Sequence, residues 1–468
     1  MTASDEAPNP GGSLAERAAA VLRRNDLGGW TKPAPHLYPH QWSWDSAFIA
    51  IGLARLDTRR AARELATLFA AQWATGLVPQ IVFNPSAPAG SYFPDPARWA
   101  CAELTSAAPN QPQTSGICQP PVHAIAAHAI RLVASQRDDE IAADARAFLR
   151  QIYPRLFLWH RYLATARDPD RSGLVTIYHP WESGTDNAPR WDVPLAAVEV
   201  GDLPPYTRRD LQHVTDPGQR PTDAEYDRYL WLLEALKRAR YDDAVAARSH
   251  PFRIKDVLFS AILVAANDAL LEIAALVEAP VAEQRQIADW RDQGRRGLAA
   301  RRDATSGLCL DYDLRANATI STQTIAGLAP LVAGGLATDE VAALAGTLES
   351  PRFAGHPAFR WALPPSTSPD DPAFDPRSYW RGPIWPFLTW LFWWSLQRAG
   401  EIARAERLRL AALAQIDAVG FAEYIDPFTG EPLGSHDQSW TAAVTLDWLA
   451  SPEDSASSAA ERMAGLEG

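Results

Sequence analysis

The sequence predicts an all-α protein in which paired helices form two concentric layers. About a dozen stretches repeat apolar residues with the period of a helix, whereas the strict alternation of a strand is scarce. One stretch, residues 387–396, is apolar on every face, and such a helix needs amphipathic partners to shield it from water. We therefore expect inner and outer helices. A solenoid of helix pairs is the less favoured alternative, because no sequence repeat beyond the pairing is visible.

The folded part is expected to start at Ser13, which forms a capping-box signature with Glu16 after a Pro/Gly-rich beginning. Residues 1–12 and 451–468 are predicted to be flexible tails, and residues 13–450 are predicted to form one domain. Further helices are expected at residues 45–56, 58–75, 122–135, 140–164, 226–240, 257–277, 283–302, 322–333, 338–348, 384–400, 402–418 and 440–449.

Two long connections interrupt the predicted helices, at residues 187–223 and 351–381. They are rich in Pro, Asp and aromatic residues, and they are far longer than normal helix connections. Long loops on a rigid scaffold commonly build a functional site. We therefore expect the long loops to form a cap over the site, with residues 187–225 as a lid insertion.

Composition and charge argue against several classes of partner. Lys and Arg number 44 against 56 Asp and Glu, a net charge of −12, and no basic run is present, so neither nucleic acid nor an anionic membrane is expected. The start of the chain lacks a secretory signal, which predicts a cytoplasmic protein. We interpret residues 384–396 as the most apolar stretch of the chain. This stretch is shorter than the ~20 residues that a membrane span needs, so we expect it to form a buried helix. The sequence is compatible with a homo-oligomer but does not predict one.

The cysteine pattern argues against a disulfide framework or a zinc cluster. Cys101, Cys118 and Cys309 are odd in number and far apart along the chain. We expect them to be buried as small hydrophobic side chains.

Tryptophan, with 18 residues, gathers beside Pro, Gly and acidic residues in four loop clusters. Aromatic faces stack on the C–H faces of a sugar ring, while Asp, Gln and Arg hydrogen-bond its hydroxyls, so this mixture predicts a pyranose pocket. The sequence contains neither a Gly-rich phosphate loop nor a G-x-S-x-G nucleophile elbow. The clusters are YPHQWSWD at 38–45, HPWESGTD at 179–186, YWRGPIW at 379–385, and residues 423–440.

Hydrolysis of a glycosidic bond commonly takes two carboxyl groups, one protonated and one ionised. Asp186 suits the proton donor, because Gly184 permits a tight turn and the flanking Trp181 and Trp191 could desolvate the carboxyl and raise its pKa. Glu423, beside aromatic residues, suits the base. Spacing alone does not select this pair among the 56 acidic residues.

Two other acidic residues compete for these assignments. Glu431 is a secondary candidate for the base, because it also lies in a Gly-flanked turn. Glu182 would raise the pKa of Asp186 if it faced the same pocket, although a hydrogen bond to backbone is the preferred interpretation.

These motifs resemble those of glycoside hydrolase family 63, specifically its bacterial members that hydrolyse glucosylglycerate and mannosylglycerate. The matching segments are YPHQWSWD at 38–45, WESGTDNAPRWD at 181–192, SYWRGPIW at 378–385, and FAEYIDP at 421–427 followed by WTAA at 440–443. The resemblance implies an (α/α)₆ barrel, inversion at the anomeric carbon, and a reaction without metal or cofactor. It makes Asp186 the general acid and Glu423 the general base, and a weaker similarity to trehalases implies the same pair.

The resemblance also implies a set of sugar contacts. Asp45 and Gln119 would hold hydroxyls, and the aromatic residues would form walls. Asp45 could instead be the N-cap of the helix that follows it, and Gln119 could be a loop amide that bonds backbone. The full set is Tyr38, Trp42, Trp44, Asp45, Gln119, Trp181, Tyr379, Trp380, Trp385 and Trp440.

In the glucosylglycerate and mannosylglycerate hydrolases, an Arg and a Tyr at this spacing bind the glycerate carboxylate. The resemblance therefore implies this role for Arg220 and Tyr226. A guanidinium fork suits that anion. In the alternative interpretation Arg220 is a surface residue and Tyr226 a core residue at a helix start. Tyr206 and His213 lie in the same insertion as lid residues without assigned roles.

The predicted function is hydrolysis of glucosylglycerate, and the sequence does not separate it from mannosylglycerate. The nearest alternative is a family 63-like α-glucosidase or α-mannosidase that acts on another small α-glycoside or an oligosaccharide. A catalytically inactive carbohydrate-binding protein would be expected to have lost a carboxylate. A terpene-type cyclase is disfavoured, because Asp242-Asp243 is not followed by the rest of a D-D-x-x-D motif.

Overall fold

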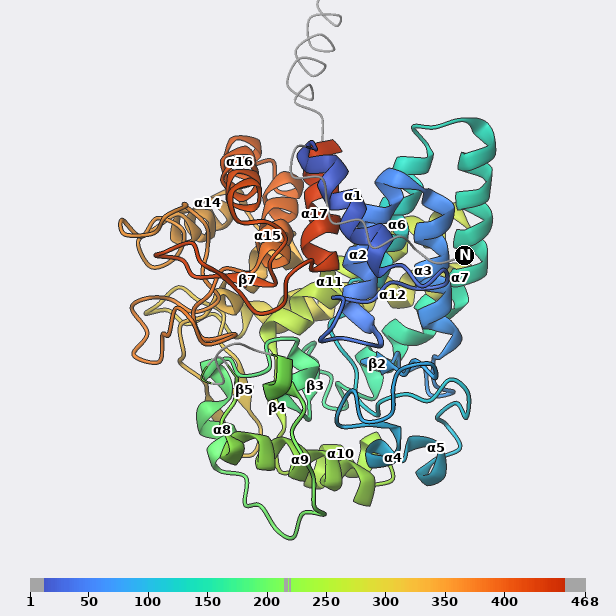
Figure 1. The fold of residues 1–468 in the computed structure, drawn as a ribbon, viewed down its shortest axis with the longest axis vertical. Helices are drawn as coiled ribbons and strands as arrows, with labels where there is room; N and C mark the ends of the chain where they lie inside the picture. The colour runs from blue at the N-terminus through green and yellow to red at the C-terminus, as the bar shows by residue number, and fades with distance from the viewer. Residues whose placement is uncertain (1–11, 214–217, 219, 451–468) are drawn as a thin grey trace, which may run out of the picture.

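The computed structural model describes residues 12–213, 218 and 220–450 of the chain (Figure 1). Within these residues, six mostly apolar helices pack in a ring. Each contacts the next, and the last packs back on the first. Nearly all side chains of the first, third and last are buried, as expected for inner helices. In order they are α2 (Ser43–Leu56), α6 (His123–Ala134), α11 (Val257–Leu276), α13 (Ala329–Ala333), α15 (Pro386–Arg398) and α17 (Ser439–Ala450).

Each inner helix also packs against an outer helix that buries one face only. The outer helix α12 shows this asymmetry, with buried positions confined to Ile287, Gly294, Gly297 and Leu298. The predicted two layers of helices are therefore present. The pairs, inner helix first, are α2 with α3 (Thr58–Ala70), α6 with α7 (Asp139–Thr165), α11 with α12 (Val281–Ala299), α13 with α14 (Thr338–Leu348), α15 with α16 (Ile402–Val419) and α17 with α1 (Leu14–Asn25).

Short elements gather at one end of the helices, the lower part of Figure 1. A four-stranded antiparallel sheet there runs in the order β3-β4-β5-β6, and α4, α5, α8, α9 and α10 lie around it. The bounds are β3 (Thr176–Ile177), β4 (Ile254–Lys255), β5 (Tyr312–Asp313), β6 (Ala318–Thr319), α4 (Pro96–Trp99), α5 (Cys101–Leu104), α8 (Asp192–Ala196), α9 (Asp223–Arg238) and α10 (Asp243–Ser249).

Two antiparallel strand pairs lie next to the N-terminal ends of inner helices. In the first, β1 (Gln41–Trp42) runs directly into α2 and pairs with β2 (Ile81–Val82). In the second, β7 (Tyr424–Ile425) pairs with β8 (Pro432–Leu433) just before α17. Both pairs therefore fix loops at the N-terminal ends of inner helices.

Most predicted helices are present with small shifts of their ends, and the capping box of Ser13 and Glu16 is formed. The predicted helix at 322–333 is wrong in length. A 3₁₀ turn, η5 (Ile325–Leu328), precedes the short α13, because Pro330 fits only the first turn of an α-helix. The predicted helix at 226–240 is present as α9, but it belongs to the group of short elements and not to the ring.

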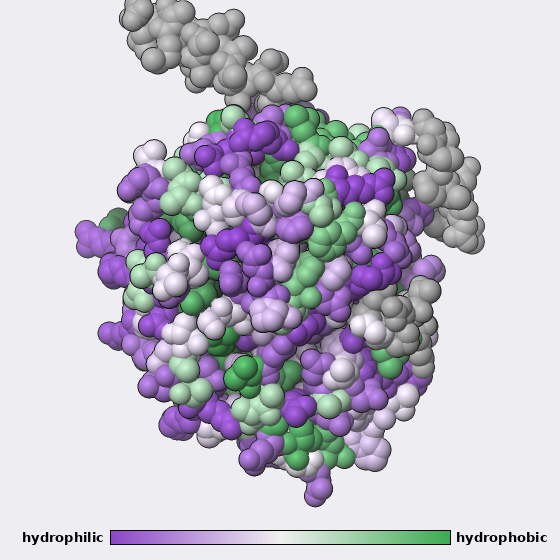
Figure 2. All heavy atoms as spheres, turned by 90° about the vertical axis from the view of Figure 1, so that its left-hand side faces the viewer, coloured by the Kyte–Doolittle hydropathy of each residue, from purple (hydrophilic) through white to green (hydrophobic). Residues whose placement is uncertain are grey.

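Except for Gly12, the predicted tails lie outside the described residues. The helix α11 is long and apolar enough to cross a membrane by length and composition, and it exceeds the 384–396 stretch in both respects. However, 83% of its apolar window is buried among the other helices, as for a central core helix. The three cysteines are buried and unpaired, as expected. On the face shown in Figure 2, hydrophilic side chains surround small groups of apolar ones.

The contact between α2 and α17 depends on Gly52. A Cβ atom added there would lie 2.3 Å from the Cα atom of Ala443. Only glycine, which has no Cβ atom, therefore allows the two helix backbones to approach this closely. This contact closes the ring between its last and first helices.

We expect Gly52→Ala to lower the free energy of unfolding by about 1–3 kcal/mol, because the added methyl group would overlap backbone atoms of α17. Gly346→Ala is the matched control. Gly346 lies on the exposed face of α14 with nothing within 4 Å of an added Cβ, so alanine should raise the same free energy by up to about 1 kcal/mol. Equilibrium denaturant unfolding measures both values. Equal effects of the two substitutions would contradict the close approach of α2 and α17.

Candidate active site

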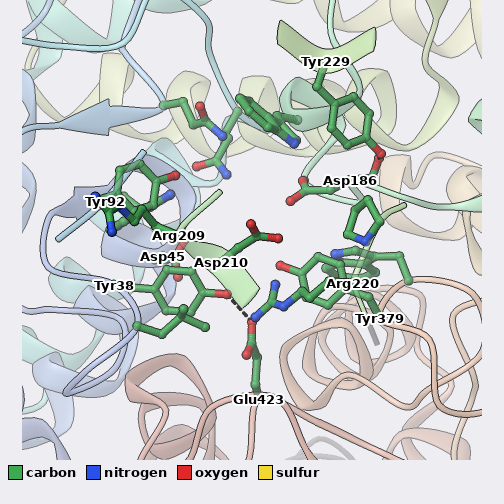
Figure 3. Close-up of a pocket in the computed structure, with 18 of the residues that line it drawn as sticks. Tyr38, Asp45, Tyr92, Asp186, Arg209, Asp210, Arg220, Tyr229, Tyr379 and Glu423 are labelled. Carbon is green, nitrogen blue, oxygen red and sulfur yellow. Dashed lines mark hydrogen bonds between the residues drawn. The ribbon is translucent and has the colours of Figure 1, made fainter. Parts of the chain in front are cut away.

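One pocket collects most of the predicted site residues at the N-terminal ends of α2 and α17 (Figure 3). It encloses about 980 Å³, a value that includes open solvent at its mouth. All predicted residues line it except Trp385. Those that do are Tyr38, Trp42, Trp44, Asp45, Gln119, Trp181, Asp186, Arg220, Tyr226, Tyr379, Trp380, Glu423 and Trp440.

Asp186 follows a 3₁₀ turn, η1 (Pro180–Ser183), and the sharp bend that Gly184 makes. Gly184 has a φ of +72°, and a Cβ there would lie 2.4 Å from the ring of Trp44, so both its backbone conformation and its packing require glycine. The backbone carbonyl of Asp186 accepts a hydrogen bond of 3.1 Å from the hydroxyl of Tyr229. The backbone of the acid is thus fixed from both sides.

The carboxyl group of Asp186 is set up to carry a proton. Burial raises its pKa, the charge of Arg220 lowers it and the charge of Glu423 raises it again, so that the resulting pKa is about 7. Among the described residues, the carboxyl accepts a hydrogen bond only from its own backbone. In Figure 3 it points into the cavity. A carboxyl that is protonated near neutral pH and faces a ligand site suits a general acid.

Glu423 reaches the cavity from a different side, at the start of the β7-β8 pair (Figure 3). It is 1% exposed. One carboxylate oxygen accepts a hydrogen bond of 2.7 Å from the hydroxyl of Tyr38, and the other accepts one of 2.8 Å from the backbone N–H of Ser435. Gly434 has a φ of +70°, and a Cβ there would lie 2.5 Å from Oε2 of Glu423. The turn therefore holds Glu423 as an oriented hydrogen-bond acceptor.

Arg220 brings a cation into this pocket. It is 9% exposed, and its Cζ atom lies 4.6 Å from the ring centroid of Tyr379. Its Nε and Nη2 atoms are buried and have no hydrogen-bond partner among the described residues. Burial opposes its charge, but the oxygens of Tyr38, Tyr379 and Glu423 outweigh that effect and raise its pKa. The alternative of a surface arginine is therefore wrong, and these free donors suit an anionic ligand.

Tyr226 is a core residue at a helix start, as the alternative interpretation expected, and it reaches the pocket as well. It is buried in the first turn of α9. Its hydroxyl donates a hydrogen bond of 3.2 Å to the carbonyl of Phe93. A hydroxyl has one hydrogen to donate, so Tyr226 must exchange this partner before it can donate to a ligand.

Three further buried N–H groups in the pocket lining have no hydrogen-bond partner within the described part of the chain. They are Nε2 of Gln438 and the indole nitrogens of Trp380 and Trp440. Unpaired indole nitrogens also occur outside the pocket lining, at Trp159, Trp393 and Trp448, so these groups alone do not indicate a ligand.

The structure corrects the placement of two tryptophans. Trp385 lies behind Trp380, with the rings parallel at an interplanar angle of 2° and their centroids 3.6 Å apart, so it supports the wall but does not form it. Trp191 was expected to desolvate Asp186, but it lies outside the lining and donates a hydrogen bond of 2.9 Å to the carbonyl of Thr185.

Asp45 is not a helix N-cap, because α2 begins at Ser43 and places Asp45 in the first turn. It is 5% exposed, and burial together with the charges of Glu423 and Asp186 raises its pKa. Gln119 bonds backbone, as the alternative interpretation expected, since its Oε1 atom accepts from the N–H of Trp44 at 3.4 Å. It nevertheless lines the pocket.

The two competing acidic residues lie outside the pocket lining. Glu182 is fully buried and pairs with Arg167 through two hydrogen bonds of 2.7 and 2.9 Å. It also accepts the backbone N–H groups of Cys118 and Tyr178, which holds the segments of Gln119 and Asp186 together. Glu431 forms an exposed ion pair with Arg377, so its position does not suit a catalytic base.

Several pocket residues were not predicted. Arg209 and Asp210 belong to the expected lid insertion, where no periodic pattern marks single positions. Tyr206, a suggested lid residue, stacks on Phe93 with centroids 5.8 Å apart and lies outside the lining, and the side chain of His213 lies outside the described residues. The unpredicted lining residues are Leu37, Gln80, Ser91, Tyr92, Phe93, Gly184, Arg209, Asp210, Pro221, Tyr229 and Gln438.

No group of three or more His, Cys, Asp or Glu side chains is placed to hold a metal ion within the described residues.

Known proteins resemble this chain over most of its length. The family model described as "Mannosylglycerate hydrolase MGH1-like glycoside hydrolase domain" matches residues 38–441. A glucosylglycerate hydrolase from Mycolicibacterium hassiacum is 51% identical over 436 residues, which are 93% of this chain and 97% of that protein. A mannosylglycerate hydrolase from Thermus thermophilus is 42% identical over 438 residues, 92% of this chain and 99% of that protein.

A solved structure also matches closely. A family 63 mannosylglycerate hydrolase from Thermus thermophilus, crystallised in complex with Tris and D-glycerate, is 42% identical and superposes with a TM-score of 0.85. The match covers 93% of this chain and 100% of that one. The similarity therefore extends over the whole helical ring and its loops.

We expect Asp186→Asn to raise the thermal unfolding midpoint, and to raise it more at pH 8 than at pH 5. The folded carboxyl, with a pKa of about 7, holds its proton more tightly than the unfolded one at 3.8, so wild-type stability falls as the pH rises between these values. Asparagine removes this loss. Calorimetry at both pH values measures the shift, with Glu431→Gln in an exposed pair as a control that should change little. An equal shift at both pH values would contradict the raised pKa.

Proposed function

Because this chain belongs to the mannosylglycerate hydrolase MGH1-like glycoside hydrolases of family 63, we propose that it is a glycosidase that hydrolyses glucosylglycerate to glucose and glycerate. Mannosylglycerate is the second candidate substrate, since two of the similar proteins act on it by name. The observation that carries the proposal is the buried guanidinium of Arg220, whose Nε and Nη2 atoms have no hydrogen-bond partner among the described residues, in the same pocket as Asp186 and Glu423.

The proposed reaction inverts the anomeric carbon. Asp186 donates its proton to the bridging oxygen as the bond to the anomeric carbon breaks. Glu423 takes a proton from a water molecule that attacks the same carbon from the opposite face. Its bonds from Tyr38 and Ser435 leave the remaining lone pairs of an oriented carboxylate for that water. Inversion requires the two carboxyl groups to lie roughly 6.5–9.5 Å apart.

The two parts of the substrate need different surroundings, and the pocket supplies both. Aromatic side chains such as Trp42, Trp44 and Trp440 offer faces or edges to the apolar sides of a sugar ring, and Asp45 and Gln119 can hold its hydroxyls. Arg220 offers its free N–H groups to the glycerate carboxylate. Tyr226 lines the same pocket and is the second glycerate residue.

We also propose that the helices form an (α/α)₆ barrel, with residues 13–450 as the catalytic domain and 187–225 as a cap insertion. The closed order of inner helices, each with its own outer helix, supports this architecture. A catalytically inactive binding protein is disfavoured, because both carboxyl groups are retained and burial raises the pKa of Asp186 to about 7, as a proton donor needs.

Asp186→Asn and Glu423→Gln should each lower kcat by about 10³-fold or more while the protein stays folded, because each removes one proton transfer. Proton NMR of the wild-type reaction should show β-glucose as the first product of the α-linked substrate. The wild-type kcat/KM should fall as the pH rises above about 7, where Asp186 loses its proton. Retention of near-wild-type activity by either variant, or α-glucose as the first product, would reject the mechanism.

Arg220→Ala should lower kcat/KM for glucosylglycerate by on the order of 10²-fold or more, about 2.7 kcal/mol, because it removes the cation that faces the glycerate carboxylate. Hydrolysis of glucosylglycerate, mannosylglycerate and trehalose by both proteins tests this. Trehalose, which lacks the carboxylate, should be a poor substrate for either. If trehalose is cleaved as well as glucosylglycerate and the variant keeps wild-type rates, a neutral α-glycoside is the substrate instead.

A further inference from the structure

The residue before the proposed acid is held from outside the pocket. Thr185 is 4% exposed, and it is absent from the lining. Its Oγ1 atom accepts a hydrogen bond of 3.0 Å from Nη2 of Arg190 and lies 2.9 Å from the hydroxyl of Ser183. Its carbonyl accepts a bond of 2.9 Å from the indole of Trp191. Three groups that do not line the pocket thus fix the peptide next to Asp186.

Arg190 is itself tied to the helical ring. Its guanidinium is 2% exposed, and its Nη1 atom lies 2.8 and 2.9 Å from the two oxygens of Asp311 and 3.4 Å from Asp256. Both carboxylates also accept backbone N–H groups in the first turn of α11, at 2.9 to 3.0 Å. Arg190 therefore connects the start of a rigid inner helix to Thr185.

The acid needs this indirect support because no other described residue donates a hydrogen bond to its carboxyl. Glu423 accepts two hydrogen bonds from neighbouring residues, whereas no other described residue bonds the carboxyl of Asp186. A proton donor has to keep its proton for the substrate, so a second acceptor in the protein would compete with the bridging oxygen. Its orientation must then come from the backbone on either side of it.

We propose that Thr185 and Arg190 are positioning residues that aim Asp186 at the bridging oxygen. Proton transfer needs the two oxygens within about 2.6–3.2 Å, and a misplacement of about 1 Å can cost 10²-fold in rate. Loss of the Thr185 contact should therefore impair protonation of the leaving group more than any other step. This inference rests on the proposed role of Asp186 as general acid.

The test compares two substrates that differ in their need for the acid. Glucosylglycerate needs its bridging oxygen protonated, whereas the fluoride of α-glucosyl fluoride leaves as an anion without a proton. Thr185→Val keeps the shape of the side chain and removes the Oγ1 acceptor. It should lower kcat for glucosylglycerate by about 10²-fold with KM nearly unchanged, and lower the rate on the fluoride less than about threefold.

Three further variants calibrate this pattern. Asp186→Asn defines the pattern of a lost acid, and Thr185→Ser, which keeps the hydroxyl, should restore the glucosylglycerate rate. Thr445→Val is the matched control: it removes a buried threonine hydroxyl that donates a bond of 2.7 Å within α17, outside the pocket lining, and should leave both rates near wild type. Should Thr185→Val fail to fold, Asp311→Asn loosens Arg190 from the other side and should show the same difference between substrates.

The outcomes separate the two proposals. If the wild type hydrolyses neither substrate, the proposed function fails. If the wild type is active but Thr185→Val lowers both rates equally, the contact supports the fold alone and the positioning proposal is overturned. It is likewise overturned if Thr185→Val keeps the wild-type rate on glucosylglycerate.

Discussion

The enclosure of helices that are apolar on nearly every face is the constraint on which the rest of the structure depends. α2 and α17 bury almost every side chain, so they can exist only inside a ring with outer helices around it. Their first turns meet at one end, and these turns carry Trp44, Asp45 and Trp440 into the pocket. The closure of the core thus decides where the site lies, and the loops at that end decide which groups enter it.

Within that site, two carboxyl groups of the same chemistry are made different by their partners. Glu423 accepts two hydrogen bonds from neighbouring residues, whereas Asp186 has no such donor from another described residue. The burial that raises the pKa of Asp186 therefore acts without compensation from a neighbouring hydrogen-bond donor. The proposed assignment of Asp186 as the acid and Glu423 as the base follows from this contrast.

The sequence was sufficient for the helices, because burial of an inner layer imposes a periodic pattern. Asp186, Glu423 and Arg220 do line one pocket, but their spacing did not select them, and it was the resemblance to a family that picked them out. The sequence failed where equivalent residues compete: nothing in YWRGPIW says that Trp380 forms the wall and Trp385 stacks behind it. It failed again for Arg209 and Asp210, since a loop has no period and side-chain direction there depends on tertiary contacts.

The same proton on Asp186 serves both binding and chemistry. The protein carries a net charge of −12, but exposed charges are screened beyond about 8–10 Å, so the pocket decides whether an anion can enter. Asp45, Asp186 and Glu423 share that pocket with the cation of Arg220. When Asp186 is protonated, the negative charge that faces an incoming carboxylate is reduced by one, and the acid is ready to act. Deprotonation of Asp186 restores the negative charge and also removes the proton that the acid donates. An anionic substrate is therefore bound best in the protonation state in which the enzyme can cleave it.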